Sequence, residues 1–188
     1  MIGIINYGSG NVKAVSNIYN YLNIENKIIN EIKDFSNVTK IILPGVGSFD
    51  SVMDKINKSG FKNIITEYVI DRKINILGIC VGMQILASSS EEGNETGLGW
   101  IPGIVKKFRN SKLRLPHMGW NDLIIQNTNL ITKEIHNGSK FYFLHSFYFE
   151  TALKENTVSM THYNHNFTSI INKDNIFGVQ FHPEKSHD

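Results

Sequence analysis

A single cysteine lies where the sequence favours a nucleophile. Residues 78–82 read Gly-Ile-Cys-Val-Gly and continue an apolar run at residues 74–79. A sharp turn from strand to helix needs such small neighbours, because its nucleophile adopts strained backbone angles. We therefore expect Cys80 at a nucleophile elbow, before a helix that begins near Val81 and whose N-terminal dipole favours a thiolate. The alternative is a buried structural cysteine, which is the more common role of a lone cysteine.

A histidine and a carboxylate near the end of the chain could act on this thiol. Residues 178–186 read Gly-Val-Gln-Phe-His-Pro-Glu-Lys-Ser, so an apolar run ends at His182 and Glu184. Such a histidine can take up the thiol proton, and a carboxylate on its far nitrogen fixes the tautomer. Cysteine and histidine partners usually meet only in the folded chain. Alone, the segment favours an ordinary turn at the end of a strand over a functional role.

A third segment could supply backbone donors. Residues 41–49 read Ile-Ile-Leu-Pro-Gly-Val-Gly-Ser-Phe, an apolar strand followed by a glycine-rich turn. Glycines let consecutive N–H groups of Gly45, Val46 and Gly47 turn toward a developing oxyanion. A tight connection between a strand and a helix explains the same residues about equally well.

The elements that must position these residues indicate an α/β fold. Parallel strands are predicted at residues 2–5, 27–29, 41–43 and 74–79, and helices at residues 12–22 and 61–71. Shorter strands are expected later, at residues 103–108, 140–144 and 157–163. We predict one domain over residues 1–188, with an open, mostly parallel sheet, helices on both faces and a β-rich second half. Ligands of such sheets bind beyond the carboxyl ends of the strands. Each of the three segments follows a predicted strand, so we expect all three at the same edge of the sheet.

Composition excludes several classes of protein. The chain has 188 residues, 41% of them hydrophobic, which suits one buried core. Its 19 basic and 17 acidic residues are interspersed, so nothing favours nucleic acid. No apolar run approaches the ~20 residues that cross a bilayer, and no signal peptide is evident, so we expect a cytoplasmic protein. His162 and His165 have no further ligand at a suitable spacing, and no metal site is predicted.

The three segments together resemble the class I glutamine amidotransferases, which carry a G-x-C-x-G-x-Q elbow and a late H-P-E motif. More narrowly, the chain resembles along its whole length the glutaminase subunits of imidazole glycerol phosphate synthases. The segments that carry this resemblance are residues 5–11, 43–49, 115–121, 141–146 and 180–186. The run Pro-His-Met-Gly-Trp-Asn at residues 116–121 is the most discriminating of them.

The resemblance implies a role for each matching residue. Cys80 would attack the side-chain amide of glutamine, His182 would shuttle the proton and Glu184 would orient His182, with no cofactor. The N–H of Val81 and one from the turn at residues 45–47 would meet the oxyanion. The positions that would hold glutamine are Gln84, Glu92, Ser146 and Phe147. Phenylalanine at the last of these departs from the tyrosine that is common there.

A partner is also implied, because ammonia released into water at neutral pH is protonated. The resemblance implies a heterodimer with a (β/α)8-barrel cyclase, which uses the ammonia to make imidazole glycerol phosphate and aminoimidazole carboxamide ribonucleotide in histidine biosynthesis. The residues expected at the partner interface or the ammonia passage are His117, Met118, Trp120, Asn121, Tyr142 and Lys185. Because residues 116–121 contain proline and glycine, we expect a loop there rather than the interior of a strand.

Two alternatives remain open at this stage. A related glutaminase could supply a barrel synthase with another acceptor, such as a nucleotide-linked or amidino sugar, since nothing in this chain binds the acceptor. The second alternative is a non-catalytic scaffold protein that kept the fold. The presence of Cys80, His182 and Glu184 argues against it. In the family, a helix after H-P-E-K-S closes one sheet face. This sequence ends two residues later, so we expect that helix to be absent.

Overall fold

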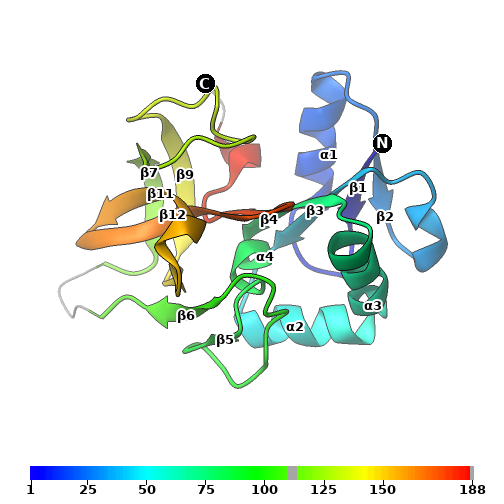
Figure 1. Ribbon diagram of the computed structural model, residues 1–188, viewed down its shortest axis with the longest axis horizontal. Coiled ribbons are helices and arrows are strands. Elements are labelled where there is room, and N and C mark those ends of the chain that lie inside the picture. The colour runs from blue at the N-terminus through cyan, green and yellow to red at the C-terminus, as the bar shows by residue number, and fades with distance from the viewer. Residues whose placement is uncertain (110–113, 187–188) are drawn as a thin grey trace.

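An eleven-stranded sheet forms the centre of the molecule (Figure 1). The computed structural model describes residues 1–109 and 114–186. Along the main path the strand order is β2-β1-β3-β4-β13-β12-β10-β6-β5, with β11 pairing to β12 and β8 to β11. Strands β7 and β9 form a separate two-stranded sheet. The last two residues lie outside the described part, so the expectation about a C-terminal helix is not tested there.

The first half of the sheet is parallel, as predicted. Its strands are β1 (Ile2–Ile5), β2 (Asn26–Ile29), β3 (Lys40–Gly45), β4 (Asn75–Cys80) and β13 (Ile176–Val179). The pairings of β1 with β2 and β3, of β3 with β4, and of β13 with β4 are all parallel. The run before Cys80 and the run before His182 are therefore neighbours, which brings both residues to one edge of the sheet.

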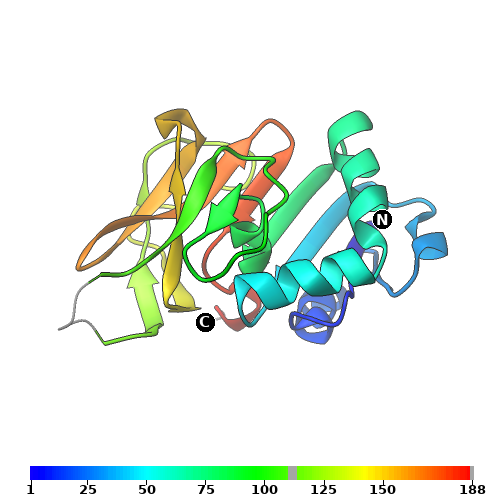
Figure 2. The ribbon, with the colours of Figure 1, turned by 90° about the horizontal axis from the view of Figure 1, so that it is seen from below.

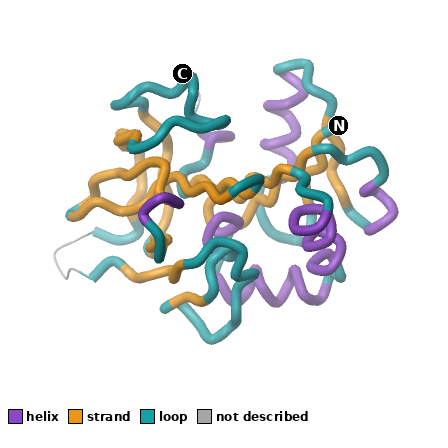
Figure 3. Tube along the Cα trace, in the orientation of Figure 1, coloured by secondary structure: helices purple, strands orange, loops and turns teal. Residues whose placement is uncertain are grey.

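Helices cover both faces of this parallel half. They are α1 (Val12–Tyr21), α2 (Phe49–Lys58) and α3 (Phe61–Thr66), which continues into a π-helical turn (Glu67–Asp71). In Figure 1 α1 lies on one face and α2 on the other, and Figure 3 shows the longer helices gathered around this half. Helix α2 was not predicted, although it buries Phe49, Val52, Met53 and Ile56 at helical spacing. Within the described residues, no helix is long and apolar enough to cross a membrane.

The second half is rich in antiparallel strands, which lie beside the parallel half in Figure 2. Its strands are β5 (Ser89–Ser90), β6 (Gly103–Lys107), β7 (His117–Asp122), β8 (Ile124–Ile125), β9 (Lys140–His145), β10 (Phe147–Thr151), β11 (Thr157–Tyr163) and β12 (His165–Lys173). Short 3-10 turns occur at Ile32–Phe35, Lys154–Asn156 and Pro183–Lys185. The strands predicted at residues 103–108, 140–144 and 157–163 are confirmed.

The expectation of a loop at residues 116–121 is wrong, because the structure has strand β7 there. It pairs residue for residue with β9, from His117 opposite His145 to Asp122 opposite Lys140. Proline precedes the strand and removes no bond from the ladder, and Gly119 takes a φ of 129° that most other residues avoid. Cross-strand pairing therefore outweighs the local signals against a strand.

Gly82 lies where the helix after β4 packs closely against β3. A Cβ at Gly82 would lie 1.9 Å from the carbonyl oxygen of Leu43. Gly82→Ala is therefore expected to lower the free energy of unfolding by about 3 kcal/mol, the upper end of the usual overpacking cost. Urea denaturation measures this, with Ser51→Ala on the exposed side of α2 as the control. Equal stability of the two variants would contradict the prediction.

Candidate active site

Cys80 occupies a strained turn between β4 and the one-turn helix α4 (Val81–Gln84). Its φ of 55° and ψ of −114° lie in a region that side chains rarely adopt. A Cβ at Gly78 would lie 2.5 Å from the carbonyl oxygen of Gly82, so both glycines are needed for α4 to fold back on the strand. The elbow is as predicted, but α4 has only four residues. Its dipole is therefore smaller than that of the helix expected from the sequence.

His182 and Glu184 form a buried pair beside this elbow. The Nδ1 atom of His182 lies 2.9 Å from Oε1 of Glu184, and both side chains are 4% exposed. Because a carboxylate only accepts hydrogen bonds, Nδ1 carries the proton and the other ring nitrogen is available to Cys80. Burial alone would lower the pKa of His182, but hydrogen bonds to Cys80 and Glu184 and attraction to both raise it to about 9. The arrangement thus favours an imidazolium beside the sulfur at neutral pH.

The segment that carries this pair is tied to strand β9. The backbone N–H of His182 donates to the carbonyl oxygen of Tyr142 at 2.9 Å. Ser186 accepts a bond from the Tyr142 N–H at 2.9 Å and donates one to the His182 carbonyl at 2.6 Å. Lys185 places its ammonium 5.6 Å from the centre of the Tyr142 ring. These contacts hold the imidazole in place from the strand opposite.

The glycine-rich turn lies next to Cys80 but does not aim all its donors at it. Gly45 is directly opposite Cys80 in the pairing of β3 with β4. The N–H of Val46 donates to the Ser9 hydroxyl at 3.2 Å, and the same hydroxyl donates to the Val46 carbonyl oxygen at 2.6 Å. Gly47 has a φ of 105°. In this structure the Val46 N–H is therefore bound to Ser9 and is not free to meet an oxyanion.

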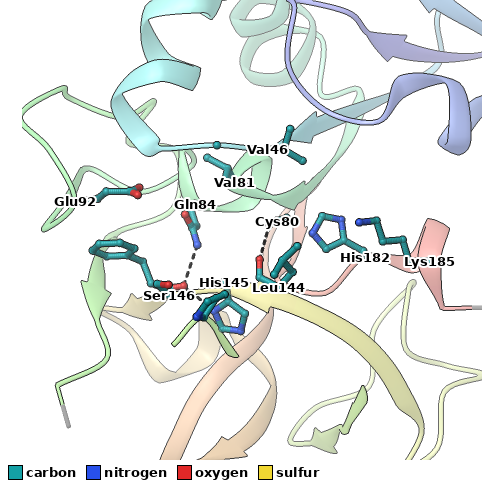
Figure 4. Close-up of a pocket in the computed structure, with 13 residues that line it drawn as sticks. Val46, Cys80, Val81, Gln84, Glu92, Leu144, His145, Ser146, His182 and Lys185 are labelled. Atoms are coloured by element: carbon teal, nitrogen blue, oxygen red, sulfur yellow. Dashed lines mark hydrogen bonds between the residues drawn. The ribbon is translucent and has the colours of Figure 1, made fainter. Parts of the chain in front are cut away.

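A pocket of about 320 Å³ opens over Cys80 (Figure 4). It brings together most of the residues predicted for glutamine hydrolysis, and Glu184 lies behind His182. The pocket is lined by Val46, Gly47, Cys80, Val81, Gln84, Glu92, Pro116, Leu144, His145, Ser146, Phe147, His182 and Lys185. One carboxylate oxygen of Glu92 accepts the first N–H of helix α2, from Phe49, at 2.7 Å.

Gln180 reaches the Cys80 sulfur, although no sequence motif singled it out. Its Nε2 atom donates to Sγ of Cys80 at 3.8 Å, and its Oε1 accepts from Gln84 at 3.0 Å. Gln84 also donates to the Phe147 carbonyl at 3.0 Å. The available signal was a polar residue at the end of an apolar strand, two positions before His182. Gln84 therefore supports the groups around Cys80 in addition to lining the pocket.

Four of the residues expected at a partner interface lie on β7 and divide between its two sides. Met118 and Trp120 are 59% and 50% exposed, and the Trp120 ring meets the Tyr142 ring edge-on at 6.5 Å. His117 is 3% exposed and points inward. Asn121 also turns inward, with its Nδ2 atom 3.1 Å from the His117 ring. Only the first two thus present side chains on the surface of this strand.

Comparison with known proteins agrees with this site. The family model for Glutamine amidotransferase class-I matches residues 4–188, and the chain belongs to that family. Imidazole glycerol phosphate synthase subunit HisH of Leptospira interrogans is 50% identical over 191 residues, which cover 100% of this chain and 94% of that protein. The subunit of the same name from Bdellovibrio bacteriovorus is 44% identical, with the same coverage of both chains. Within the class, the chain therefore belongs to the HisH family.

Solved structures show the same fold at greater evolutionary distance. A crystal structure of a glutamine amidotransferase superposes with a TM-score of 0.76 at 17% identity, covering 97% of this chain and 90% of that one. The structure of PurLQS from Thermotoga maritima gives a TM-score of 0.76 at 20% identity, covering 97% and 87%. The predicted fold class is confirmed.

Proposed function

We propose that this chain hydrolyses L-glutamine through Cys80, His182 and Glu184 and passes the ammonia to a (β/α)8-barrel cyclase. The cyclase would make imidazole glycerol phosphate and aminoimidazole carboxamide ribonucleotide, in the cytoplasm. One observation carries the proposal: Cys80 sits on a strained elbow under a pocket that His182 also lines, and a buried carboxylate holds that histidine. Membership of the HisH family supports the choice of reaction.

The geometry suits a two-step acyl transfer. The Cys80 thiolate attacks the amide carbon of glutamine, and the imidazolium of His182 gives its proton to the departing nitrogen, so ammonia leaves and a thioester remains. Water then attacks the thioester while neutral His182 accepts one of its protons, and the sulfur leaves as the thiolate, so glutamate is released and the thiolate and imidazolium are restored. Glu184 keeps the proton on Nδ1 throughout and stabilises the cationic ring.

Substrate recognition would use the far end of the pocket. Glu92, Gln84 and Ser146 line it at the side away from Lys185 (Figure 4), and Phe147 follows Ser146 in the pocket lining. A carboxylate such as Glu92 suits the α-ammonium group of glutamine. The oxyanion would be met by the N–H of Val81 and by that of Val46, once the latter leaves Ser9.

The exposed part of β7 is the proposed docking site for the cyclase. Met118 and Trp120 present apolar surface beside Tyr142 and Lys185, and Lys185 also lines the pocket. A path that begins at this lysine would carry ammonia away from Cys80 without exposing it to bulk water. The relatives named as synthase subunits support assembly with a second protein.

Reconstitution tests the proposal directly. The purified chain is combined with the barrel cyclase from the same genome, and product formation is followed with glutamine or with ammonium salts as the nitrogen source. We expect product from both, with one glutamate released per product formed from glutamine. A complex that uses ammonium salts but never glutamine would contradict the proposal. A complex that forms only with a different barrel synthase would instead favour the related glutaminase with another acceptor.

A further inference from the structure

A series of buried and partly buried hydrogen bonds, here called the histidine chain, leads from β7 to the pocket. Asn121 Nδ2 lies 3.1 Å from Nε2 of His117, and Nδ1 of His117 lies 3.0 Å from Nε2 of His145. The chain ends where Nδ1 of His145 meets the Phe147 carbonyl oxygen at 2.8 Å. Figure 4 shows His145 beside Ser146 at the pocket wall. No step of the proposed mechanism requires either histidine.

The chemistry of the two ends fixes the direction of every bond. A carbonyl oxygen only accepts, so Nδ1 of His145 must carry a proton. In a neutral ring its Nε2 then accepts from Nδ1–H of His117, whose own Nε2 accepts from the amide of Asn121. That amide also donates to the His162 carbonyl at 3.0 Å. All donors and acceptors along the chain are satisfied when both rings are neutral.

The surroundings of the two rings enforce this neutral state. His117 stacks between Tyr163 at 4.0 Å and Phe143 at 5.0 Å, and His145 packs against Phe167 at 5.0 Å. Burial lowers the pKa of His117 to about 4 and, aided by the nearby His117 and His182, that of His145 to about 3. A neutral His145 therefore adds no repulsion to the imidazolium of His182.

The Phe147 carbonyl connects the histidine chain to the nucleophile. It accepts from His145 on one side and from Gln84 Nε2 on the other. The amide nitrogen of Gln84 must face this oxygen, and the same nitrogen faces Oε1 of Gln180 at 3.0 Å. Gln180 then turns its own NH₂ group toward the Cys80 sulfur. One carbonyl thus sets the orientation of two side-chain amides beside the reacting centre.

We propose that Asn121, His117 and His145 are positioning residues that hold the Phe147 carbonyl, and with it Ser146, Phe147 and Gln84, in place for glutamine. The inference rests on the proposed function and deepens it. These residues touch neither the reacting amide nor the triad. Their loss therefore weakens glutamine binding more than it slows the chemical steps, and KM rises while kcat changes little.

The test compares three variants in the complex with the cyclase. His117→Leu removes the donor to Nε2 of His145 and one acceptor of the Asn121 amide. We expect the KM for glutamine to rise about tenfold, equivalent to about 1.4 kcal/mol, with kcat within about twofold. His117→Asn places an amide N–H where Nδ1 was, so donation to His145 and a nearly normal KM are kept. Phe108→Leu removes a ring packed on His145 at 5.5 Å but no side-chain hydrogen bond, and should lower the melting temperature alone.

Each outcome decides one question. An unchanged KM in His117→Leu, or an equal rise in all three variants, would overturn the inference while the active wild type upholds the proposed function. A wild-type complex that does not hydrolyse glutamine would overturn the proposed function itself. Should His117→Leu fail to fold, nitrogen NMR of the wild-type histidines decides the geometry. We expect both rings to carry their proton on Nδ1. A proton on Nε2 of either ring would contradict the inferred hydrogen-bond directions and overturn the inference.

Discussion

Replacement of Cys80 by alanine is expected to abolish glutamine hydrolysis, with a loss of at least about 10⁴-fold in kcat, as for other nucleophiles in catalytic triads. The sulfur is the atom proposed to attack, and the chain has no second thiol to replace it because it has a single cysteine. The side chain is 4% exposed and loses only one atom, so the elbow should persist. Glutamate release by the cyclase complex measures the effect.

The ammonia-dependent reaction of the same complex serves as the control for Cys80→Ala. The proposed chemistry is divided between two subunits, so product formation from ammonium salts should stay within about twofold of the wild-type rate. Glutamine hydrolysis at close to the wild-type rate would show that the elbow does not carry the nucleophile. Loss of both reactions would point instead to disrupted assembly.

The elbow could be predicted because its strain has a local sequence signature. Cys80 needs a φ of 55°, and α4 needs close backbone contact at Gly78 and Gly82, so the pattern of residue types records the geometry. The H-P-E segment could be predicted for a similar reason, because its proline cannot continue the backbone hydrogen bonding of strand β13. Both signals concern neighbours in sequence, and both were found.

The supporting network could not be predicted in the same way. The contact between Gln180 and Cys80 depends on how β13 pairs with β4, and that between His117 and His145 depends on the register of β7 with β9. No local pattern encodes either register. Strand β7 illustrates the limit, because its glycine and preceding proline favoured a loop and only the partner strand makes it extended.

Two histidines that line the pocket have opposite pKa shifts because their surroundings differ. The pKa of His182 is raised to about 9 by its contacts with Cys80 and Glu184, which outweigh burial, whereas burial lowers that of His145 to about 3. One ring is therefore cationic and the other neutral at pH 7. Separation of this kind supports the proposed role of His182 as the proton shuttle and the proposed structural role of His145.

The isolated chain is expected to hydrolyse glutamine about 100- to 1000-fold more slowly than its complex with the liganded cyclase, the usual cost of one missing oxyanion donor. The Val46 N–H is held by the Ser9 hydroxyl, so of the two proposed oxyanion donors only the Val81 N–H is available. Docking of the cyclase would have to turn the peptide before Val46, at Gly45. Initial rates of glutamate release from the chain alone and from the complex measure the ratio.

Variants of Ser9 separate this explanation from a general effect of assembly. Ser9→Ala removes both bonds to Val46, so the isolated chain should become several-fold more active while the complex keeps its rate. Ser9→Thr retains a hydroxyl and should behave like the wild type. An isolated wild-type chain as fast as the complex would refute the role of Val46. Equal rates in the isolated Ser9→Ala variant and the isolated wild type would contradict this role of the hydroxyl. They would show that the Val46 N–H stays turned away from the oxyanion even without its bond to Ser9.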